Sequence, residues 1–582
     1  FKEDEFAKLL HECHNVIRNR EKLDPAAAFD EIAKILFVKV YVERELRTKR
    51  SRKNLFSVEY LDDQLGKHPL NTLFGQTKEA YADDKIFESD EEIRLKPATG
   101  REIVKLLERY NLSETSEDIK GIAFERFLGR TFRGDIGQFF TPRTIVEFMI
   151  RMVEPQEGDV ICDPASGSGG FLIRFFEIVR QQILADADLQ YQAFKKETKT
   201  DKTLSPEKMA TMLREKFDSI QGTLDPEKTD SRLWKLANRC IYGTDANDRM
   251  ARTSKMNMIM HGDGHGGVHH HDGFLNVNGI FEGRFDIVLT NPPFGANVEP
   301  TDVVRESDAA LNREAEKRYT EEFRDLYREA MARVAAAKGK PIASLFELPK
   351  GNGTEKEREK RVKSAKIKTE ILFIERCLSL LKPGGRLGIV LPEGIFNNPS
   401  LAYVREFCEN RAFIRAVVSL PQETFFSSGA SVKASLLFLQ KFSEQEQADF
   451  DAKQVAAHAE VKAKYADAVT TETERLKTAI AAAKDGRDTE KRKTLQKELT
   501  DYEKRMAETI VKETRALLKE RFPYPIFLYE AEKVGITATG EQDQNELVPN
   551  DNQPPGITKT CLELYREFRR NPEQFFLSEA TA

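Results

Sequence analysis

The chain has 582 residues, of which 40% are hydrophobic and 32% charged, and its formal net charge is −5 at pH 7. This composition is typical of a soluble globular protein with several domains, and because no run of 18 apolar residues occurs we expect no membrane span and no membrane partner. Six scattered cysteines without a CxxC pair argue against a zinc site or a disulfide scaffold and predict a reducing, cytoplasmic compartment.

The first part of the chain shows the spacing of amphipathic helices. Two sets of apolar residues share this spacing: Phe6, Leu9, Leu10 and Cys13, and then Ala33, Leu36, Phe37 and Val40. We therefore predict an N-terminal helical domain over residues 1–130.

Short apolar runs alternate with helical stretches from about residue 155 onward. Five runs are candidate strands: Val160–Cys162, Cys240–Tyr242, Phe285–Leu289, Leu387–Leu391 and Ala416–Leu420. Strands alternating with helices indicate a parallel, Rossmann-like α/β sheet. We assign this domain to residues 131–441, with a charged, partly helical insertion at about 300–365.

Residues 443–521 contain one glycine, Gly486, and no proline, and they are rich in Ala, Glu and Lys. Two long helices flanking this glycine predict an antiparallel hairpin that projects from the sheet domain. We assign the hairpin to residues 442–522. A C-terminal tail, residues 523–582, then carries one short helix near Cys561–Phe568.

A glycine-rich loop, Asp163 to Phe171 (DPASGSGGF), lies between the first predicted strand and a helix predicted from Phe171 to Leu184. Glycines at such a turn allow the backbone to approach a ligand at the carboxyl end of a parallel sheet. A dinucleotide site would use a similar turn, so the loop alone leaves the ligand open.

A second motif, Asn291-Pro292-Pro293-Phe294, follows the third predicted strand. Two consecutive prolines stiffen the backbone, so the Asn291 side-chain oxygen and the Pro292 carbonyl oxygen become two acceptors on one rigid element. Two acceptors that hold both hydrogens of a planar amine favour a pyramidal nitrogen and free its lone pair for attack. Phe294 offers a face for stacking a base. We therefore predict Asn291, Pro292 and Phe294 as catalytic residues.

Further motifs stand in a recognisable order along the chain. Gly137 to Pro142 (GQFFTP) precedes the glycine-rich loop, and Leu381 to Leu387 and Gly429 to Leu439 follow the second motif. Together these motifs resemble the modification (M) subunit of type I restriction-modification systems, in the γ class of N6-adenine DNA methyltransferases. The resemblance covers roughly residues 5–50 and 120–441.

The resemblance implies an S-adenosylmethionine-dependent methyltransferase fold and methyl transfer to adenine N6. It assigns the methionine half of S-adenosylmethionine to seven residues: Thr141, Pro142, Asp163, Ala165, Ser166, Gly167 and Gly169. It also implies that Asp245 binds the ribose hydroxyls and that Asp263 accepts a hydrogen bond from the cofactor's adenine amine. No metal ligand is predicted, although the histidine-rich segment 264–273 leaves either a metal site or a flexible loop open.

The same resemblance implies the partners. These are double-stranded DNA with a flipped adenine, a specificity (S) subunit, and, more distantly, a restriction (R) subunit and a second M subunit. The helical hairpin or the tail is the predicted docking site for the S subunit, whereas a solvated structural arm is the alternative for the hairpin. The absence of a Pro-Cys dipeptide excludes cytosine-C5 methylation. Two other functions remain open: a protein glutamine-N5 or RNA amine methyltransferase, and an inactive scaffold that binds DNA or a partner.

Overall fold

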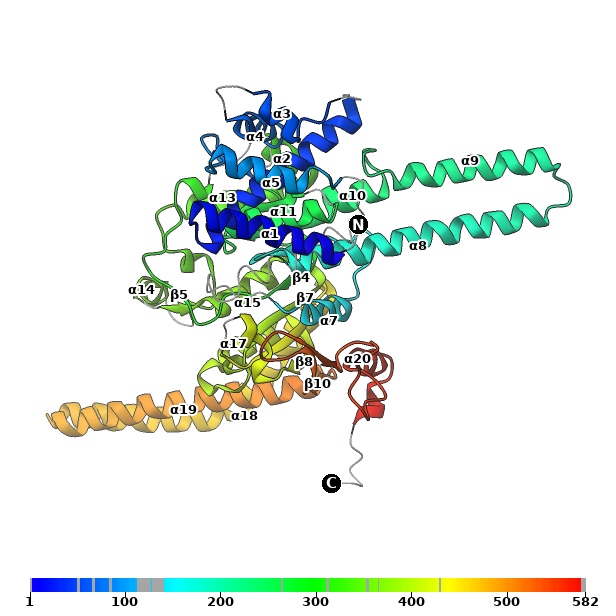
Figure 1. Ribbon diagram of the computed structural model, residues 1–582. Coiled ribbons are helices and arrows are strands. Elements are labelled where there is room, and N and C mark those ends of the chain that lie inside the picture. Colours follow the sequence, from blue (N-terminus) through cyan, green and yellow to red (C-terminus); the bar gives the residue numbers. More distant parts are fainter. Residues whose placement is uncertain are drawn as a thin grey trace.

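The computed structural model describes residues 3–49, 53–64, 68–82, 86–112, 127, 141–262, 265–309, 313–351, 355–364, 366–428 and 431–576. Figure 1 shows a central α/β body with a helical region at the N-terminal end and two long helical arms that project in different directions. The α/β body and both helical regions confirm the predicted fold class.

An eight-stranded sheet forms the body. Its strands are β1 (Ile161–Asp163), β2 (Ile241–Asp245), β3 (Val268–His270), β4 (Phe285–Thr290), β7 (Leu381–Pro392), β8 (Ala412–Ser419), β9 (Ala434–Lys441) and β10 (Phe527–Glu530). Their order is β10-β8-β9-β7-β4-β1-β2-β3. Strands β7, β4, β1, β2 and β3 run parallel, whereas β9 is antiparallel to both of its neighbours, β7 and β8. The carboxyl ends of β1, β2 and β4 therefore meet at one edge of the sheet.

The five predicted strands coincide with β1, β2, β4, β7 and β8, but the expectation of a parallel sheet was wrong in one respect. The sheet is mixed, because β9 enters it as an antiparallel strand between β7 and β8. Two further strands were not predicted. The edge strand β3 is only three residues long and half-exposed, and β10 joins the sheet from beyond the helical hairpin.

Helices cover both faces of the sheet, as the alternation along β1 shows. Ile161 packs on one face with α7 (Arg143–Val153), α8 (Gly170–Thr200) and α20 (Cys561–Arg570). Cys162 packs on the other face with α13 (Asp325–Ala336), α15 (Thr369–Leu380) and α17 (Ala402–Glu409). Both faces are thus removed from water, as is usual for a largely parallel sheet.

The N-terminal helices pack together as predicted and rest on α11 (Asp248–Met260) of the body. They are α1 (Glu3–Glu21), α2 (Pro25–Lys49), α3 (Val58–Asp62), α4 (Pro69–Ala80) and α5 (Pro97–Leu107). Both predicted apolar sets are buried in this cluster, which also includes Met256 and Met260 of α11. Arg249 of α11 pairs with Asp30 of α2 at 2.9 Å. The body and the helical region are therefore joined beside the end of β2.

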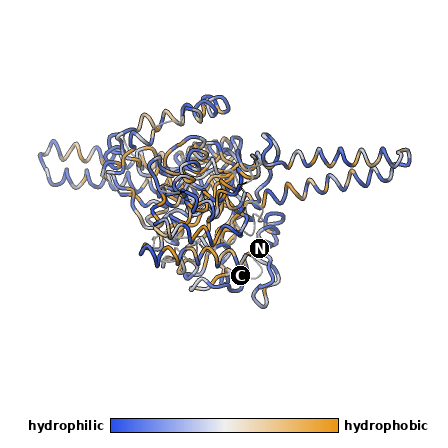
Figure 2. Tube along the Cα trace, turned by 45° about the horizontal axis from the view of Figure 1, so that its top comes forward, coloured by the Kyte–Doolittle hydropathy of each residue, from blue (hydrophilic) through white to orange (hydrophobic). Residues whose placement is uncertain are grey.

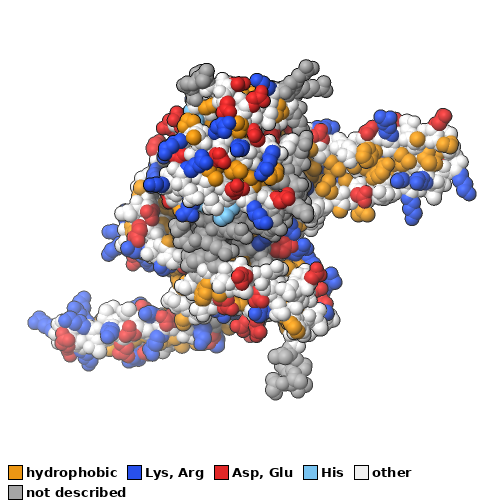
Figure 3. Space-filling model, viewed as in Figure 1, with side chains coloured by type: hydrophobic (Ala, Val, Ile, Leu, Met, Phe, Trp, Pro, Cys, Tyr) orange, Lys and Arg blue, Asp and Glu red, His pale blue; other side chains and the backbone are white. Residues whose placement is uncertain are grey.

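The predicted helical hairpin is present as α18 (Glu444–Asp485) and α19 (Thr489–Arg521). Ser443 and Glu446 form a capping box that starts α18. A second arm, α8 with α9 (Pro206–Leu224), was not predicted, because the helix expected over Phe171–Leu184 continues to Thr200. Figure 2 shows apolar and polar residues alternating along both arms, and Figure 3 shows hydrophobic side chains along the α8–α9 arm.

The remaining elements lie around the central sheet or in the C-terminal tail. The charged insertion contains α12 (Arg313–Phe323), α13 and α14 (Glu355–Ser364), and its ends pair as the short strands β5 (Asn297–Val298) and β6 (Ile367–Lys368). Two more helices, α10 (Arg232–Arg239) and α16 (Gly394–Asn397), flank the sheet, and β11 (Val534–Ile536) pairs with β12 (Gln542–Asn545) in the tail. Among the described helices, none combines the length and apolarity that a membrane crossing requires.

Candidate active site

Asn291 directly follows β4 and lies at the carboxyl edge of the sheet. Its Nδ2 donates a hydrogen bond of 3.0 Å to Thr141 Oγ1, which fixes the orientation of the side-chain amide. Its Oδ1 is buried and accepts no hydrogen bond from the described part of the chain. A buried acceptor without a donor costs about 1–3 kcal/mol. The amide oxygen can therefore accept a hydrogen bond from an N–H donor of a bound ligand.

The loop that carries Asn291 is anchored to the start of α15. Thr369 Oγ1 donates to the Pro293 carbonyl at 2.8 Å, and Gly295 N donates to Glu370 Oε2 at 3.2 Å. The pairing of β5 with β6 closes the same loop from its far end. Pro292 itself is buried, and no hydrogen bond to its carbonyl oxygen is made by the described residues. The loop is thus held by neighbours that leave both predicted acceptors available.

The glycine-rich loop connects β1 to α8 in a tight turn. Gly167 has a φ of 52° and Gly169 a φ of 84°, a left-handed backbone that favours glycine. A Cβ atom on Gly169 would lie 2.6 Å from Ser254 Oγ, so this position also has no space for a side chain. The Asp163 carboxylate accepts from Ala165 N at 3.0 Å and closes the turn. The loop consequently presents backbone rather than side chains to the cavity beside it.

Two carboxylates lie under this loop in a poorly solvated position. Asp163 is almost fully buried, and burial raises its pKa to about 7. Asp245, at the end of β2, accepts from Gly167 N at 2.9 Å and from Asn247 N at 2.8 Å. Burial also raises the pKa of Asp245, although these two backbone hydrogen bonds act in the opposite direction. The site therefore places acceptor groups in a medium where a ligand's donors are bound strongly.

Several hydroxyl and amide groups behind the loop are also buried. Ser166 Oγ and Ser254 Oγ have no hydrogen-bond partner among the described residues. Asn257 Nδ2 donates to the Ser168 carbonyl at 3.0 Å and ties α11 to the loop. These polar atoms lie where an apolar core would otherwise be expected, which is typical of a ligand site.

A cavity of about 50 Å³ unites the two motifs. Its lining residues are Thr141, Val146, Asp163, Ala165, Ser166, Gly167, Ser168, Gly170, Phe171, Met250 and Asn291. A second cavity, of about 450 Å³, follows the end of β2 between α2 and α11 and includes Asp30, Asn247 and Arg249. The structure therefore brings Asn291 to the glycine-rich loop although about 120 residues separate them in sequence.

Comparison with known protein families shows which family the chain belongs to. The model of the family described as N-6 DNA Methylase matches residues 115–222, 225–326 and 346–503, which is more than half of the chain. The chain belongs to the N-6 DNA Methylase family.

Curated relatives of this N-6 DNA methylase are subunits of type I restriction enzymes. It is 25% identical over 306 residues to the EcoEI methylase subunit of Escherichia coli, covering 51% of this chain and 47% of that protein. It is 22% identical over 310 residues to the EcoKI methylase subunit of Escherichia coli K12, covering 52% and 40%. The chain thus spans about half the length, or less, of these relatives.

Solved structures resemble this N-6 DNA methylase over a larger part of the chain. The type I restriction-modification system methyltransferase subunit from Streptococcus thermophilus matches with a TM-score of 0.47 and 16% sequence identity. The match covers 76% of this chain and 85% of that one.

The other predicted site residues of the methylase are distributed around the same edge. Pro142 is buried and precedes α7, and Phe294 is half-buried against the hydrophobic cluster of α7 and α8. Asp263 lies outside the described residues. The histidine-rich segment is not simply a loop, since residues 268–270 form the edge strand β3. Among the described residues, no group of three or more His, Cys, Asp or Glu is placed to hold a metal ion.

Sequence reasoning missed several residues of the methylase site. Val146 and Met250 line the cavity, but apolar residues on helices carry no signal that separates them from ordinary core. Thr369 and Glu370 anchor the Asn291 loop from α15, which follows the charged insertion. These two residues are far from the Asn291 motif in sequence, so their contact with the loop could not be predicted. It becomes visible only in the folded structure.

Proposed function

We propose that this chain is the modification subunit of a type I restriction-modification complex and transfers a methyl group from S-adenosylmethionine to adenine N6 in DNA. The observation that carries the proposal is the buried, unpartnered Asn291 Oδ1, which lies beside the glycine-rich loop. An acceptor held in this way suits an exocyclic amine better than a hydroxyl, because an amine offers two N–H donors to Asn291 Oδ1 and the Pro292 carbonyl.

The protein's part in the reaction is positioning and electrostatics. S-adenosylmethionine, when bound, supplies a methyl group that its sulfonium already activates. Asn291 Oδ1 and the Pro292 carbonyl accept the two amine hydrogens, which draws the nitrogen lone pair out of conjugation with the ring. Thr141 holds the Asn291 amide in the orientation that this role requires. After methyl transfer the nitrogen carries one proton too many, and it releases this proton to solvent.

The methionine half of the cofactor would enter the small cavity beside the glycine-rich loop, and the rest of the cofactor would extend beyond this cavity along the edge of the sheet. The backbone at Gly167 and Gly169 allows a close approach, and the free hydroxyl of Ser166 and the carboxylate of Asp163 supply polar contacts. Thr141, Pro142 and Ala165 complete the methionine side. Asp245 would accept from the ribose hydroxyls, and Asp263 is proposed to accept from the adenine amine. Since the orphaned polar atoms and the glycine turn lie together, the residues present fit this cofactor.

The target adenine must leave the double helix to reach Asn291, because a paired base hides its N6 amine in the stack. Extrusion costs a few kcal/mol, which stacking partly offsets. We assign Phe294 as the stacking platform, since it follows the acceptors on the same anchored loop.

The partners follow from the same proposal. A specificity (S) subunit would read the DNA sequence and dock on the α18–α19 hairpin or on the tail, and an R subunit and a second M subunit would complete the complex. The compartment we propose is the cytoplasm, where the six buried, unbridged cysteines would stay reduced.

The test is transfer of tritium from methyl-labelled S-adenosylmethionine. We expect label in double-stranded DNA when the chain is combined with its proposed specificity subunit. Equal amounts of RNA and of a glutamine-containing protein serve as competing acceptors. Label in RNA or protein instead of DNA would replace the proposal with an RNA or glutamine-N5 methyltransferase, and cofactor binding without transfer to any acceptor would indicate a scaffold.

A further inference from the structure

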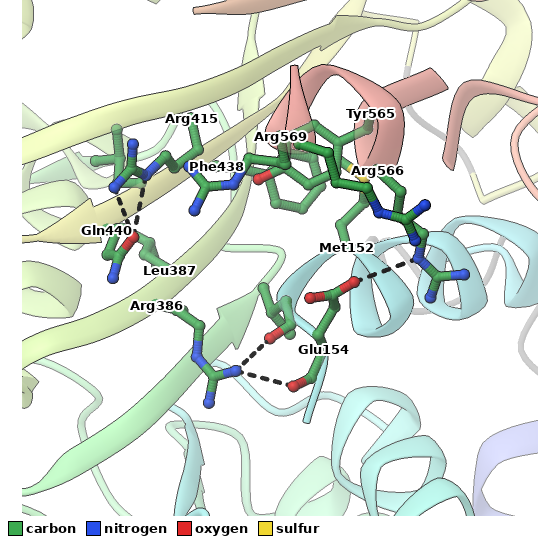
Figure 4. A pocket seen from close by; sticks show the side chains of 13 residues that line it. Met152, Glu154, Arg386, Leu387, Arg415, Phe438, Gln440, Tyr565, Arg566 and Arg569 are labelled. Atoms are coloured by element: carbon green, nitrogen blue, oxygen red, sulfur yellow. Dashed lines mark hydrogen bonds and ion pairs between the residues drawn. The ribbon is translucent and has the colours of Figure 1, made fainter. Parts of the chain in front are cut away.

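A cavity of about 570 Å³ lies at the edge of the sheet opposite to the candidate active site. Figure 4 shows the side chains that line it. Arg386 of β7 lines it and pairs in register with Ile287, toward the start of β4, whereas Asn291 follows the end of that strand. The end of α7, the strands β8 and β9, and the helix α20 form its other walls. Its size falls within the range of small-molecule sites in proteins.

Five arginines from three elements line this cavity, which we call the arginine cavity: Arg386, Arg415, Arg566, Arg569 and Arg570. The one carboxylate among its lining residues is Glu154, which pairs with Arg566 at 3.3 Å. Behind the wall, Asp159 pairs with Arg386 at 2.6 Å. Two negative charges thus face five positive charges.

Arg415, Arg569 and Arg570 carry the uncompensated charge, and the first two face each other across the cavity. Arg415 is half-buried, and both of its hydrogen bonds go to the neutral Gln440 Oε1, at 3.0 Å and 2.9 Å. Arg569 extends from α20 toward it (Figure 4). Burial and then repulsion by Arg569 lower the pKa of Arg415 to about 10, although Tyr565 and Glu446 act in the opposite direction. Within the described residues, no carboxylate lies within 4.0 Å of either guanidinium.

The helix dipole explains only part of this arrangement. Arg569 and Arg570 stand in the last turn of α20, where a positive charge is favourable. That effect does not explain why Arg415 faces them from β8 without an acid between them. Arg415 is half-buried and Arg569 is exposed at the rim of the cavity, and two like charges this close repel each other unless an anion joins them.

We propose that the arginine cavity binds a phosphoryl group, either as inorganic phosphate or as the phosphate ester of a nucleotide. Guanidinium groups present paired donors that match phosphate oxygens in a bidentate geometry. Phe438 and Tyr565 form an apolar wall beside the arginines, which the organic part of an ester can contact. The cavity is recessed and faces away from Asn291, so a small ligand suits it better than the backbone of the DNA substrate.

The experiment is isothermal titration calorimetry of the full chain at low ionic strength with inorganic phosphate, uridine monophosphate and uridine. Uridine compounds avoid competition for an adenosine pocket. We expect both phosphate-bearing ligands to bind and uridine to give no heat. An affinity at least ~10-fold higher for the monophosphate than for phosphate would identify the ester as the source, and equal affinities would identify the free ion.

Arg569→Gln should weaken phosphoryl binding by ~10-fold or more, because a charge-assisted contact is lost. The matched control is Arg492→Gln on the exposed side of α19, which should leave the affinity unchanged. Without ligand, Arg569→Gln should raise the unfolding temperature, since it relieves the repulsion on Arg415.

Four results would overturn the proposal: no binding of either phosphate ligand, equal binding of uridine, an affinity unchanged by Arg569→Gln, or displacement of phosphate by a DNA duplex. The last result would assign the cavity to the DNA backbone. A lower unfolding temperature for Arg569→Gln with unchanged phosphate affinity would leave Arg569 as a helix-terminal charge only.

Discussion

Asn291 illustrates how one side chain can be prepared for catalysis by its neighbours. Its amide nitrogen is engaged by Thr141, and its amide oxygen is left buried without a donor. With the amide flipped, the Thr141 hydroxyl would donate to Oδ1 instead, and Nδ2 rather than Oδ1 would be left buried without a partner. In the orientation that the structure shows, Nδ2 donates to Thr141 and Oδ1 is left free to receive the proposed substrate amine.

Replacing Asn291 with alanine should lower the rate of methyl transfer by ~10²–10³-fold, as expected for the loss of one acceptor that acts in the transition state. The affinity for S-adenosylmethionine should change little, since the glycine-rich loop is the proposed cofactor site. Single-turnover rates and equilibrium dialysis measure the two quantities. Asn238→Ala on α10 is the matched control, and equal losses of binding and rate in Asn291→Ala would contradict the assigned role.

Asp163 should make the stability of the chain depend on pH. Its pKa in the folded chain is about 7, above the ordinary value of 3.8, so the folded state holds the proton more tightly than the unfolded state. Its contribution is complete below about pH 4 and is lost as the pH rises through about 7. Asp163→Asn removes the titration and can still accept from Ala165 N.

The unfolding temperature of Asp163→Asn, relative to that of the original chain, should therefore increase between pH 5 and pH 8. The affinity for S-adenosylmethionine should fall in the same variant, since a functional carboxylate is lost. Differential scanning calorimetry at both pH values tests the first point. A temperature difference that is the same at pH 5 and pH 8 would show that Asp163 has an ordinary pKa.

At the scale of elements, the Asn291 loop depends on α15 for its position. Thr369→Val removes the hydrogen bond to the Pro293 carbonyl with little change in shape. We expect kcat to fall by about 10-fold, which corresponds to roughly 1.4 kcal/mol, while cofactor affinity stays the same. Thr369→Ser keeps the hydroxyl and should restore the rate. If serine and valine behave alike, the hydrogen bond does not position the loop.

Strongly patterned elements were predictable from sequence, whereas elements stabilised by distant neighbours were not. The runs at β4 and β8 and the hairpin α18–α19 show clear periodicity or a clear absence of helix breakers. Strand β3 was missed because its two histidines, and the glycines before it, have no strand pattern, and it is held by pairing with β2. The α8–α9 arm was missed because polar residues after Leu184 conceal a helix that continues.

The candidate site followed the same rule. The Asn291 motif and the glycine-rich loop are rigid local structures, and their residue types predict their geometry. The structure brings the two together at one cavity. The support from Thr369 and the polar atoms of Ser254 and Asn257 come from α15 and α11. No local pattern distinguishes these supporting residues from ordinary helix positions, so only tertiary packing reveals them.

At the scale of the whole molecule, the two arms extend beyond the body that holds the active site (Figure 1). The α18–α19 hairpin is held by contacts along its length, including Lys464 with Glu513 at 2.8 Å. A stiff, charged arm of this kind is well suited to a partner that must be placed at a distance. We therefore expect the chain alone to methylate DNA poorly until a specificity subunit is added.

Shortening the hairpin tests this expectation. Replacing residues 472–498 with a short Gly-Ser turn joins the helices near the level where Tyr502 OH donates to the Ala468 carbonyl. Cofactor binding should be unchanged, and the stimulation by the specificity subunit should be lost. Methylation rates with and without that subunit give the answer. Sequence-specific methylation by the full chain alone would contradict the need for a partner.

The central claim is that Asn291 presents an adenine N6 amine to the activated methyl group, and the identity of the methylated base tests it most directly. DNA would be treated with the chain, its specificity subunit and S-adenosylmethionine bearing a trideuterated methyl group, and its nucleosides would be analysed by mass spectrometry. The account predicts trideuterated N6-methyldeoxyadenosine with the original chain and ~10²–10³-fold less of it with Asn291→Ala after the same short reaction time. Label on a cytosine, or undiminished label on adenine with Asn291→Ala, would contradict it.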